Sequence, residues 1–180
     1  MNLQLEAMAL AMPEVASHPN RLPFRGVLTL VGIASPRSPS GSRGHRVMLT
    51  HAATEQALPS LLGMALDFTP ALDSHDVRRK IGIITEATVE PLRAGAAATA
   101  PAQLAVSGYL FAHDFPDVVT EMRAQQGGAL GMSYEIANVE VPNQEAFIWT
   151  VTRFTFTGAA VLRRDKAAYP ETWIAVSTGN

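Results

Sequence analysis

The sequence predicts an α+β domain in which about seven strands, mainly antiparallel, form a closed or nearly closed barrel flanked by a few helices. Two observations lead to this class. Short segments rich in β-branched and aromatic residues recur along the chain, separated by turns that contain proline, glycine or serine. Helical signals occur in only a few places, and no internal repeat or domain linker divides the chain.

The composition is that of a soluble globular protein. The 180 residues suit one domain with a sizeable core, and 47% of them are hydrophobic against 17% charged. A net charge of −2 gives no reason to expect nucleic acid or an anionic membrane as a partner. The absence of cysteine excludes disulfides, zinc–thiolate sites and cysteine nucleophiles, and it fits a reducing compartment.

The apolar runs of the chain indicate neither a membrane span nor a signal peptide. Each run is interrupted well short of the roughly 20 residues that a membrane helix needs. Residues 1–12 are apolar, but they include Glu6 and lack a basic leading segment. We therefore expect a cytoplasmic protein.

The first quarter of the chain is expected to contain an arm and two strands. Residues 1–22 contain two prolines and show weak periodicity, which indicates a short helix or a loose arm. Residues 24–34 are rich in β-branched side chains and predict a strand. A loop with prolines, glycines, serines and arginines follows at 35–46, and residues 47–50 predict a short strand.

A helix is expected at residues 52–64. Apolar residues recur there at helical spacing, and Thr50 is placed to cap the N-terminus. Pro59 interrupts the pattern, so the helix is expected to break or restart at that point. Residues 65–68 are expected to be extended.

A hairpin and a second helix are expected next. Residues 80–90 and 104–111 predict two paired strands joined by a long, alanine-rich loop. The first of these strands alternates, and its expected common face consists of Ile81, Ile83, Thr85, Ala87 and Val89. Asp114 as N-cap and Pro116 in the first turn then predict a helix start.

The last third predicts two long strands and a weakly patterned tail. Gly127 is expected to end the preceding helix, and residues 130–141 predict one strand. Residues 147–157, dense in aromatic and β-branched side chains, predict another. The expected organisation is an N-terminal arm (1–22), a barrel domain (23–170) and a C-terminal tail (171–180).

The sequence contains no recognisable metal or cofactor motif. Its five histidines include no HExxH and no pair at helical metal-ligand spacing, so no metal site is expected. Residues 41–44 form a Gly-Ser-Arg-Gly loop, which lacks the lysine and the helix of a phosphate-binding loop. No cofactor is expected.

Ser133 is the candidate nucleophile. It follows Gly131 just inside a predicted strand, where a serine can be either an ordinary strand hydroxyl or a nucleophile. A serine hydroxyl becomes nucleophilic only when a neighbouring base accepts its proton. Among the histidines, His75 stands between a loop and a strand, where rigid scaffolds often hold functional side chains.

Several short motifs follow one another in order between residues 27 and 169. They are His75-Asp76, Lys80-Ile81-Gly82, a helix at Phe115, Leu130-Gly131-Met132-Ser133-Tyr134, Phe156-Thr157-Gly158-Ala159-Ala160-Val161-Leu162 and Ala167-Ala168-Tyr169. In their order and spacing these motifs resemble one family, the prohead (capsid maturation) serine proteases of tailed bacteriophages.

The resemblance implies a fold, an activity and partners. The family is grouped with herpesvirus assemblins, whose fold is a β-barrel flanked by helices. Ser133 would be the nucleophile and His75 the general base of a serine endopeptidase. Its substrates would be the scaffold and major capsid protein inside the assembling procapsid in the host cytoplasm, together with its own termini by autocleavage. A homo-oligomer is compatible with this role.

The third catalytic residue departs from the family pattern. Many phage relatives place a glutamate where this chain has Arg153, and an arginine cannot accept a hydrogen bond from histidine. Three alternatives for the residue that orients His75 remain open: Thr155, a backbone carbonyl, or a carboxylate from another position. Glu135 is one such carboxylate, and it shares a strand face with Ser133. Arg163 and Arg164 are candidates for the oxyanion site, and a solvated turn is the alternative for both.

Two other functional classes stay open. One is a catalytically inactive homologue that acts as a structural or scaffold component of the procapsid, which the missing acid favours. The other is a barrel binding module without a viral role, for which the chain offers no ligand motif. The presence of both His75 and Ser133 favours the enzyme.

Overall fold

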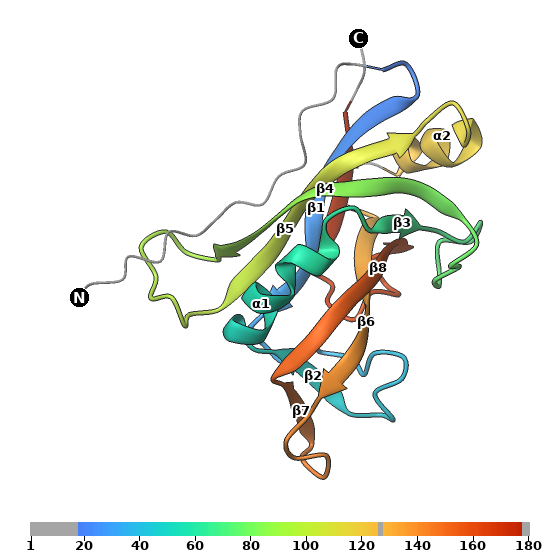
Figure 1. The fold of residues 1–180 in the computed structure, drawn as a ribbon. Coiled ribbons are helices and arrows are strands. Elements are labelled where there is room, and N and C mark those ends of the chain that lie inside the picture. Colours follow the sequence, from blue (N-terminus) through green and yellow to red (C-terminus); the bar gives the residue numbers. More distant parts are fainter. Residues whose placement is uncertain (1–17, 126–127, 178–180) are drawn as a thin grey trace.

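The structure, a computed structural model, describes residues 18–125 and 128–177, which form nine strands and two helices (Figure 1). The elements are β1 (Arg21–Val31), β2 (Arg46–Leu49), α1 (His51–Leu61), β3 (Ala65–Asp67), β4 (Lys80–Pro91), β5 (Ala102–Phe111), α2 (Pro116–Ala124), β6 (Leu130–Glu140), β7 (Ile148–Val151), β8 (Arg153–Arg163) and β9 (Trp173–Val176).

Seven strands form one curled, mixed sheet in the order β6-β8-β3-β4-β5-β1-β9. All its pairings are antiparallel except β3 with β8, and β2 and β7 form a separate parallel pair. The mainly antiparallel β architecture with flanking helices is confirmed. The sheet is a half-barrel, however, so the expected closed or nearly closed barrel is not formed. The terminal strands β6 and β9 share no ladder, although Thr172 Oγ1 accepts a hydrogen bond from the Met132 backbone N–H at 3.2 Å.

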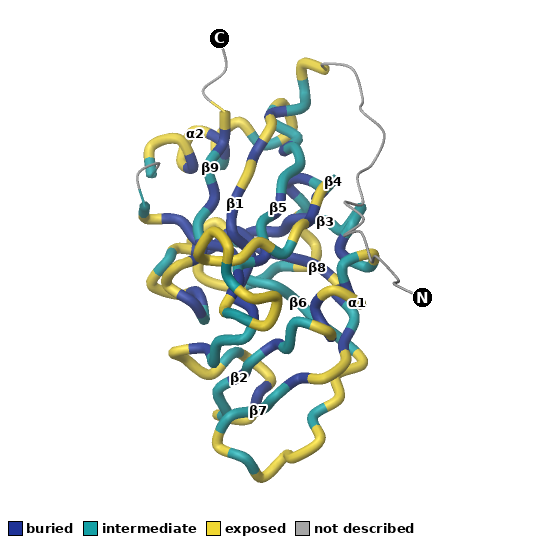
Figure 2. Tube along the Cα trace, turned by 90° about the vertical axis from the view of Figure 1, so that its left-hand side faces the viewer, coloured by how far each residue is buried: buried dark blue, intermediate teal, exposed yellow. Residues whose placement is uncertain are grey.

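The core lies on the concave side of the curled sheet, where α1 covers strands β8 and β4 (Figure 1). The buried face of α1 consists of Ala53, Thr54, Ala57 and Leu61. Ser60 Oγ accepts a hydrogen bond from the Phe156 backbone N–H at 2.9 Å, which fastens the helix to β8. In Figure 2 many of the buried segments lie in the middle of the molecule, and β2 and β7 lie toward its lower end.

The two helix starts differ in how well the sequence predicts them. Thr50 caps α1 as expected, because its side chain accepts a hydrogen bond from the Ala53 N–H at 3.3 Å. The helix continues through Pro59 to Leu61, so the expected break there is wrong. Asp114 does not cap α2: the N-cap residue is Phe115, and the Asp114 carboxylate instead accepts a hydrogen bond from Asn20.

A bulge corrects the expected alternation of β4. The register with β5 shifts between Ile84 and Glu86, which turns the strand by one residue. Ile84 and Ala87 therefore share a buried face across the bulge, whereas Ile83 and Thr85 of the expected face are only half-buried. Ile81, which precedes the bulge, is buried as well.

Two expectations about the C-terminal third are also corrected. The segment expected as one strand divides at Thr152 into β7 and β8, which belong to different sheets. The expected tail contains β9, which pairs with β1 through Trp173–Val176. Residues 1–17, expected as part of the arm, and Gly127, expected as a helix stop, lie outside the described residues. Within the described chain, neither helix is long and apolar enough to cross a membrane.

Candidate functional site

A row of paired residues across four strands forms the base of the site. Ser133 on β6 is opposite Ala160 on β8, Ala160 is opposite Asp67 on β3, and Asp67 is opposite Lys80 on β4. Directly opposed residues in a sheet project to the same face, and neighbouring strands are about 4.8 Å apart. Ser133 and Asp67 therefore flank β8 on one face.

Glu135 shares this face because it lies two residues beyond Ser133. Its partner in the ladder is Gly158. A Cβ atom on Gly158 would lie 2.8 Å from Glu135 Oε2, so only glycine leaves the carboxylate its present place. Gly158 and Ala160 thus form a floor of small residues between the Glu135 and Asp67 side chains, while Ala159 and Val161 point into the core.

The loop between β3 and β4 carries His75 over this floor. Asp67 Oδ1 accepts a hydrogen bond from the Asp76 backbone N–H at 3.3 Å, and Asp76 forms an ion pair with Arg79 at 3.3 Å. The first contact fastens the loop to the end of β3, and the second is an ion pair within the loop.

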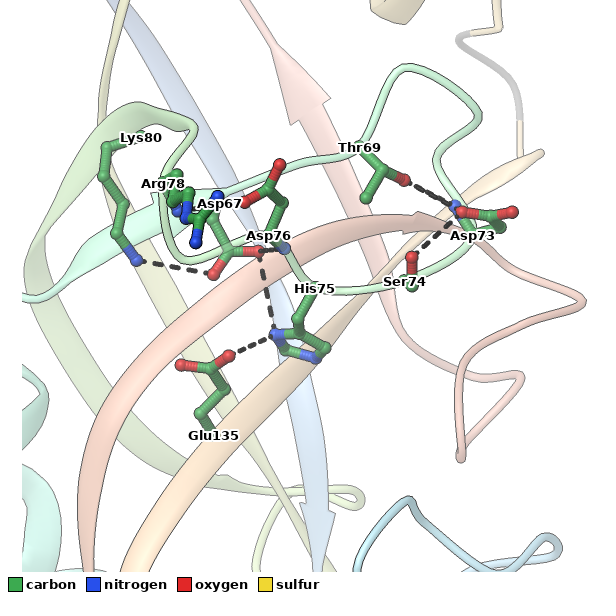
Figure 3. Close-up of polar contacts among 9 residues, drawn as sticks. All are labelled: Asp67, Thr69, Asp73, Ser74, His75, Asp76, Arg78, Lys80 and Glu135. Carbon is green, nitrogen blue, oxygen red and sulfur yellow. Dashed lines mark hydrogen bonds and ion pairs between the residues drawn. The ribbon is translucent and has the colours of Figure 1, made fainter.

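The His75 ring is turned toward the two carboxylates (Figure 3). Its Nδ1 atom lies 3.1 Å from Glu135 Oε1 and 3.7 Å from Asp67 Oδ1. Nδ1 nevertheless has no hydrogen-bond partner among the described residues, so its contact with Glu135 is one of proximity without hydrogen-bond geometry. Unliganded active sites commonly show such loose geometry.

Ser133, His75 and Glu135 line the same pocket, which has a volume of about 700 Å³. Its polar lining comes from the loop at residues 37–42 and from Asp73, Ser74 and Lys166. Its apolar lining includes Val47, Ile136, Val139, Trp149 and Val151. The pocket therefore extends from the serine and histidine to residues of β2 and β7.

The other candidate residues lie away from this pocket. Arg153 is exposed and forms an ion pair with Glu140 at 3.2 Å, and Thr155 is opposite Ala137 on β6. Arg163 forms an ion pair with Asp165 at 3.4 Å, and neither it nor Arg164 lines the pocket. Of the residues proposed as third or oxyanion partners, only Glu135 meets His75.

Asp67, Arg37 and Lys166 are part of the site but were not expected there. Asp67 carried a usable signal, because a charged residue in an otherwise apolar strand is buried only with partners. Its side chain is fully buried, and Oδ2 lies 3.5 Å from Lys80 Nζ. Arg37 and Lys166 come from turns at residues 32–45 and 164–172, and Arg37 donates a hydrogen bond to the Asp165 carbonyl. No local pattern distinguishes them from ordinary surface cations.

The pKa values of one carboxyl group and two buried tyrosines in and near the pocket are shifted. Hydrogen bonds from the side chains of Thr69 and Ser74 hold the pKa of Asp73 below its usual value, so this carboxylate stays charged. Burial raises the pKa of Tyr134, whose hydroxyl has no hydrogen-bond partner among the described residues. Burial likewise raises the pKa of Tyr169, whose hydroxyl contacts the carbonyls of Ile33 and Val47.

Asp67, His75 and Glu135 are also the described residues that could hold a metal ion. Their ligand atoms lie within 4.8 Å of one another. The expectation of no metal site considered only histidine pairs, and this mixed group assembles from three separate elements. Lys80 already contributes a positive charge to Asp67 Oδ2, which competes with a cation at that oxygen.

Comparisons with models of known protein families, with curated proteins and with solved structures find no match.

Proposed function

We propose that this protein is a serine endopeptidase of the phage prohead type, which cleaves scaffold and capsid-protein segments, and itself, within the assembling procapsid. The observation that carries the proposal is that Ser133, His75 and Glu135 line one pocket, with Glu135 3.1 Å from His75 Nδ1. A hydroxyl, an imidazole and a carboxylate are the components of acyl transfer by a serine nucleophile.

The chemistry proceeds in two stages, and in each of them His75 first takes up a proton and then gives it away. Nδ1 faces Glu135, which leaves Nε2 to accept the proton of Ser133 Oγ as the oxygen attacks the peptide carbonyl. His75 then gives this proton to the leaving amine, and an acyl-enzyme remains on Ser133. A water molecule, deprotonated by His75, releases the acyl group and restores the serine hydroxyl. Glu135 holds the imidazole in the tautomer that can accept at Nε2 and stabilises the imidazolium.

Residues of the motifs that carry the family resemblance converge on this chemistry. His75 and Ser133 belong to two of these motifs, and Gly158 and Ala160 belong to a third. The last two form the floor on which His75 and Glu135 meet. In this proposal Glu135, on the strand that bears the nucleophile, takes the acceptor role that Arg153 cannot fill. A herpesvirus-protease-like arrangement of the curled sheet is part of this proposal.

An extended peptide is a suitable substrate for this site. β6 ends the order of the large sheet and pairs on one side with β8, so the described chain gives its other side no ladder partner. Such an edge can bind an extended segment through its backbone groups. The pocket follows this edge from Ser133 to Val139, which suits a polypeptide more than a small molecule.

The second candidate is an inactive structural component of the procapsid. The observation that favours it is the unaligned Nδ1 of His75, which has no hydrogen-bond partner among the described residues. This candidate differs from the enzyme in one outcome: it leaves the scaffold uncut.

Co-expression with phage scaffold and major capsid protein tests the proposal. Ser133→Ala and His75→Ala should each abolish cleavage of the scaffold and of the chain itself while leaving the fold intact. Ser38→Ala is the matched control, because Ser38 lines the same pocket and only donates a hydrogen bond to the Gly44 carbonyl. Wild-type processing by either the Ser133 or the His75 variant contradicts the proposal, and an uncut scaffold with the wild type supports the structural component.

A further inference from the structure

The Nδ1 nitrogen of His75 is buried and unpaired, although the ring that carries it reaches solvent. This nitrogen has no hydrogen-bond partner among the described residues, whereas the side chain as a whole is 26% exposed. It faces two carboxylates, with Glu135 Oε1 at 3.1 Å and Asp67 Oδ1 at 3.7 Å (Figure 3). A buried polar atom without a partner is unfavourable, so a nitrogen in this position suits a further ligand.

The three side chains have the spacing of metal ligands. Their ligand atoms lie within 4.8 Å of one another, and no other such group of three occurs in the part of the chain that the structure describes. In tetrahedral coordination with bonds of about 2.0–2.2 Å, neighbouring ligand atoms are about 3.4 Å apart. The two distances from His75 Nδ1, 3.1 Å and 3.7 Å, lie on either side of that value. The spacing therefore suits a small cation.

The charges around His75 also favour a cation. Asp67 is fully buried, and a carboxylate removed from water is unfavourable unless positive charge and hydrogen-bond donors surround it. Lys80 Nζ lies 3.5 Å from Oδ2, which leaves Oδ1 with the Asp76 backbone N–H at 3.3 Å. Glu135 has no lysine or arginine as an ion-pair partner among the described residues. Two carboxylates thus share one ammonium group, and a divalent ion would offset the remaining negative charge.

We infer that Asp67, His75 and Glu135 bind a divalent transition-metal ion of the Zn²⁺ type, and that the bound ion blocks the proposed serine chemistry. One imidazole nitrogen and two carboxylate oxygens are ligands that Zn²⁺ accepts, whereas Mg²⁺ and Ca²⁺ prefer oxygen alone. The exposed part of the ring lies in the pocket, which gives the ion a route from solvent.

A metal at Nδ1 decides which nitrogen of the neutral imidazole carries the proton. The ion binds the lone pair of Nδ1, so the proton is on Nε2. Nε2 is then a donor and cannot accept the proton of Ser133 Oγ, while Glu135 coordinates the ion instead of orienting the ring. Metal binding and activation of the serine therefore exclude each other. This exclusion rests on the proposed function, but the binding of the ion does not.

Calorimetric titration of the full chain with Zn²⁺, after dialysis first against EDTA and then against chelator-free buffer, tests the site. The wild type should bind one ion. His75→Ala, Glu135→Gln and Asp67→Asn should each weaken binding by about tenfold to a hundredfold or more, since each removes a ligand. Asp73→Asn is the matched control, because it removes a carboxylate that lines the same pocket outside the group of three, and it should bind as the wild type does.

Two binding results would overturn the inference. Zinc that binds equally to the wild type and to the His75 and Glu135 variants would be an adventitious ion elsewhere on the chain. A wild type that binds no zinc, or that binds Mg²⁺ as tightly, would contradict the ligand set. These two side chains are 26% and 24% exposed, so their variants decide the question even if buried Asp67 does not tolerate substitution.

The rate at which a fluorophosphonate probe labels Ser133 tests the exclusion. Labelling of the metal-free wild type should slow by at least about tenfold when Zn²⁺ saturates the site, and it should recover when EDTA is added. Glu135→Gln, which is expected to be labelled slowly, should respond little to the same zinc concentration. Zinc that binds at the group and leaves wild-type labelling unchanged, or speeds it, overturns the exclusion.

Failure of the inference and failure of the proposed function give different results. If the probe does not label Ser133 in the metal-free wild type, the proposed function fails, and zinc binding that depends on His75 and Glu135 still supports the metal site. If the metal-free wild type is labelled but binds no zinc, only the inference fails. Ser133→Ala should bind zinc as the wild type does, because the serine is not one of the ligands.

Discussion

Gly158 stands directly opposite Glu135 in the ladder between β8 and β6, and the Glu135 carboxylate occupies the space that a side chain at Gly158 would fill. The same carboxylate lies 3.1 Å from the Nδ1 atom of His75. A glycine in the middle of a strand usually weakens it. Here the absence of a side chain is what permits a carboxylate from the neighbouring strand to reach the histidine.

Gly158→Ala should therefore reduce cleavage while leaving the fold intact. The new Cβ would lie 2.8 Å from Glu135 Oε2, and the flexible glutamate can move away at little cost to stability. Moving away breaks its contact with His75, so kcat should fall by about tenfold to a hundredfold. Kinetics and thermal unfolding of the variant measure the two effects.

The double variant Gly158→Ala/Glu135→Gln identifies the cause of this loss. If the alanine acts through Glu135, adding it to Glu135→Gln should reduce kcat little further. Two independent losses that multiply in the double variant would contradict this explanation.

Glu135→Gln should lower kcat by about 100-fold to 10,000-fold, because an amide can hold the imidazole in the wrong tautomer and does not stabilise the imidazolium. The matched control is Glu140→Gln on the same strand. Glu140 is exposed and its ion pair with Arg153 is at the surface, so its loss should lower the free energy of unfolding by at most about 1 kcal/mol. Cleavage activity should be unchanged. A loss of cleavage in the Glu140 variant would indicate that Arg153 takes part in the reaction.

Removal of divalent metal ions should leave cleavage unchanged. The proposed chemistry uses a serine, a histidine and a carboxylate, and none of its steps needs a metal. The Asp67, His75 and Glu135 group could nevertheless bind one. Activity measured after dialysis against EDTA, and again after Zn²⁺ is added back, distinguishes the two cases. Activity that disappears with EDTA and returns with zinc would identify a metallopeptidase.

The free energy of unfolding should fall as the pH rises above about 10, the usual pKa of tyrosine. Burial raises the pKa of Tyr134 and Tyr169 in the folded protein, so both stay protonated there while the unfolded chain releases their protons. The stability that they contribute is complete below this pH and is lost as the pH rises, by at most about 1.4 kcal/mol per pH unit for each tyrosine.

Urea unfolding of the wild type and of Tyr134→Phe at pH 8 and pH 11 measures this effect. The Tyr134 hydroxyl has no partner among the described residues, so the variant should match the wild type at pH 8 and be more stable at pH 11. Equal stabilities at pH 11 would show that Tyr134 ionises freely in the folded state.

Local signals were sufficient to predict most of the elements. The strand at residues 80–90, for example, is β4 with nearly the same ends, and Thr50 caps α1 because an N-cap is decided by neighbouring residues. The errors arose where distant parts of the chain decide the structure. The bulge at Ile84 exists only in relation to β5, and β9 has a regular structure only because β1 pairs with it.

In the candidate site, too, local signals predicted some residues, whereas contacts between distant parts of the chain decided the others. Ser133 and His75 were singled out by their local context and by the order of the motifs, and the structure brings both to one pocket. Glu135 was left open because two residues along a strand separate it from Ser133, and nothing in the sequence shows that the His75 loop folds back over β8. The charge of Asp67 in an apolar strand was a usable signal of a buried, partnered side chain. Its place beside His75, like that of Gly158 opposite Glu135, exists only across the β3–β8–β6 ladders and could not be read from spacing in the sequence.

The identity of the labelled residue tests the central claim most directly. After reaction with a fluorophosphonate probe, peptide mapping by mass spectrometry should place a single adduct on Ser133 in the wild type and in Glu140→Gln. The adduct should be absent from His75→Ala and formed much more slowly in Glu135→Gln. An adduct on another serine, or equal labelling of Ser133 in wild type and His75→Ala, would contradict the assignment of Ser133 as a nucleophile activated by His75.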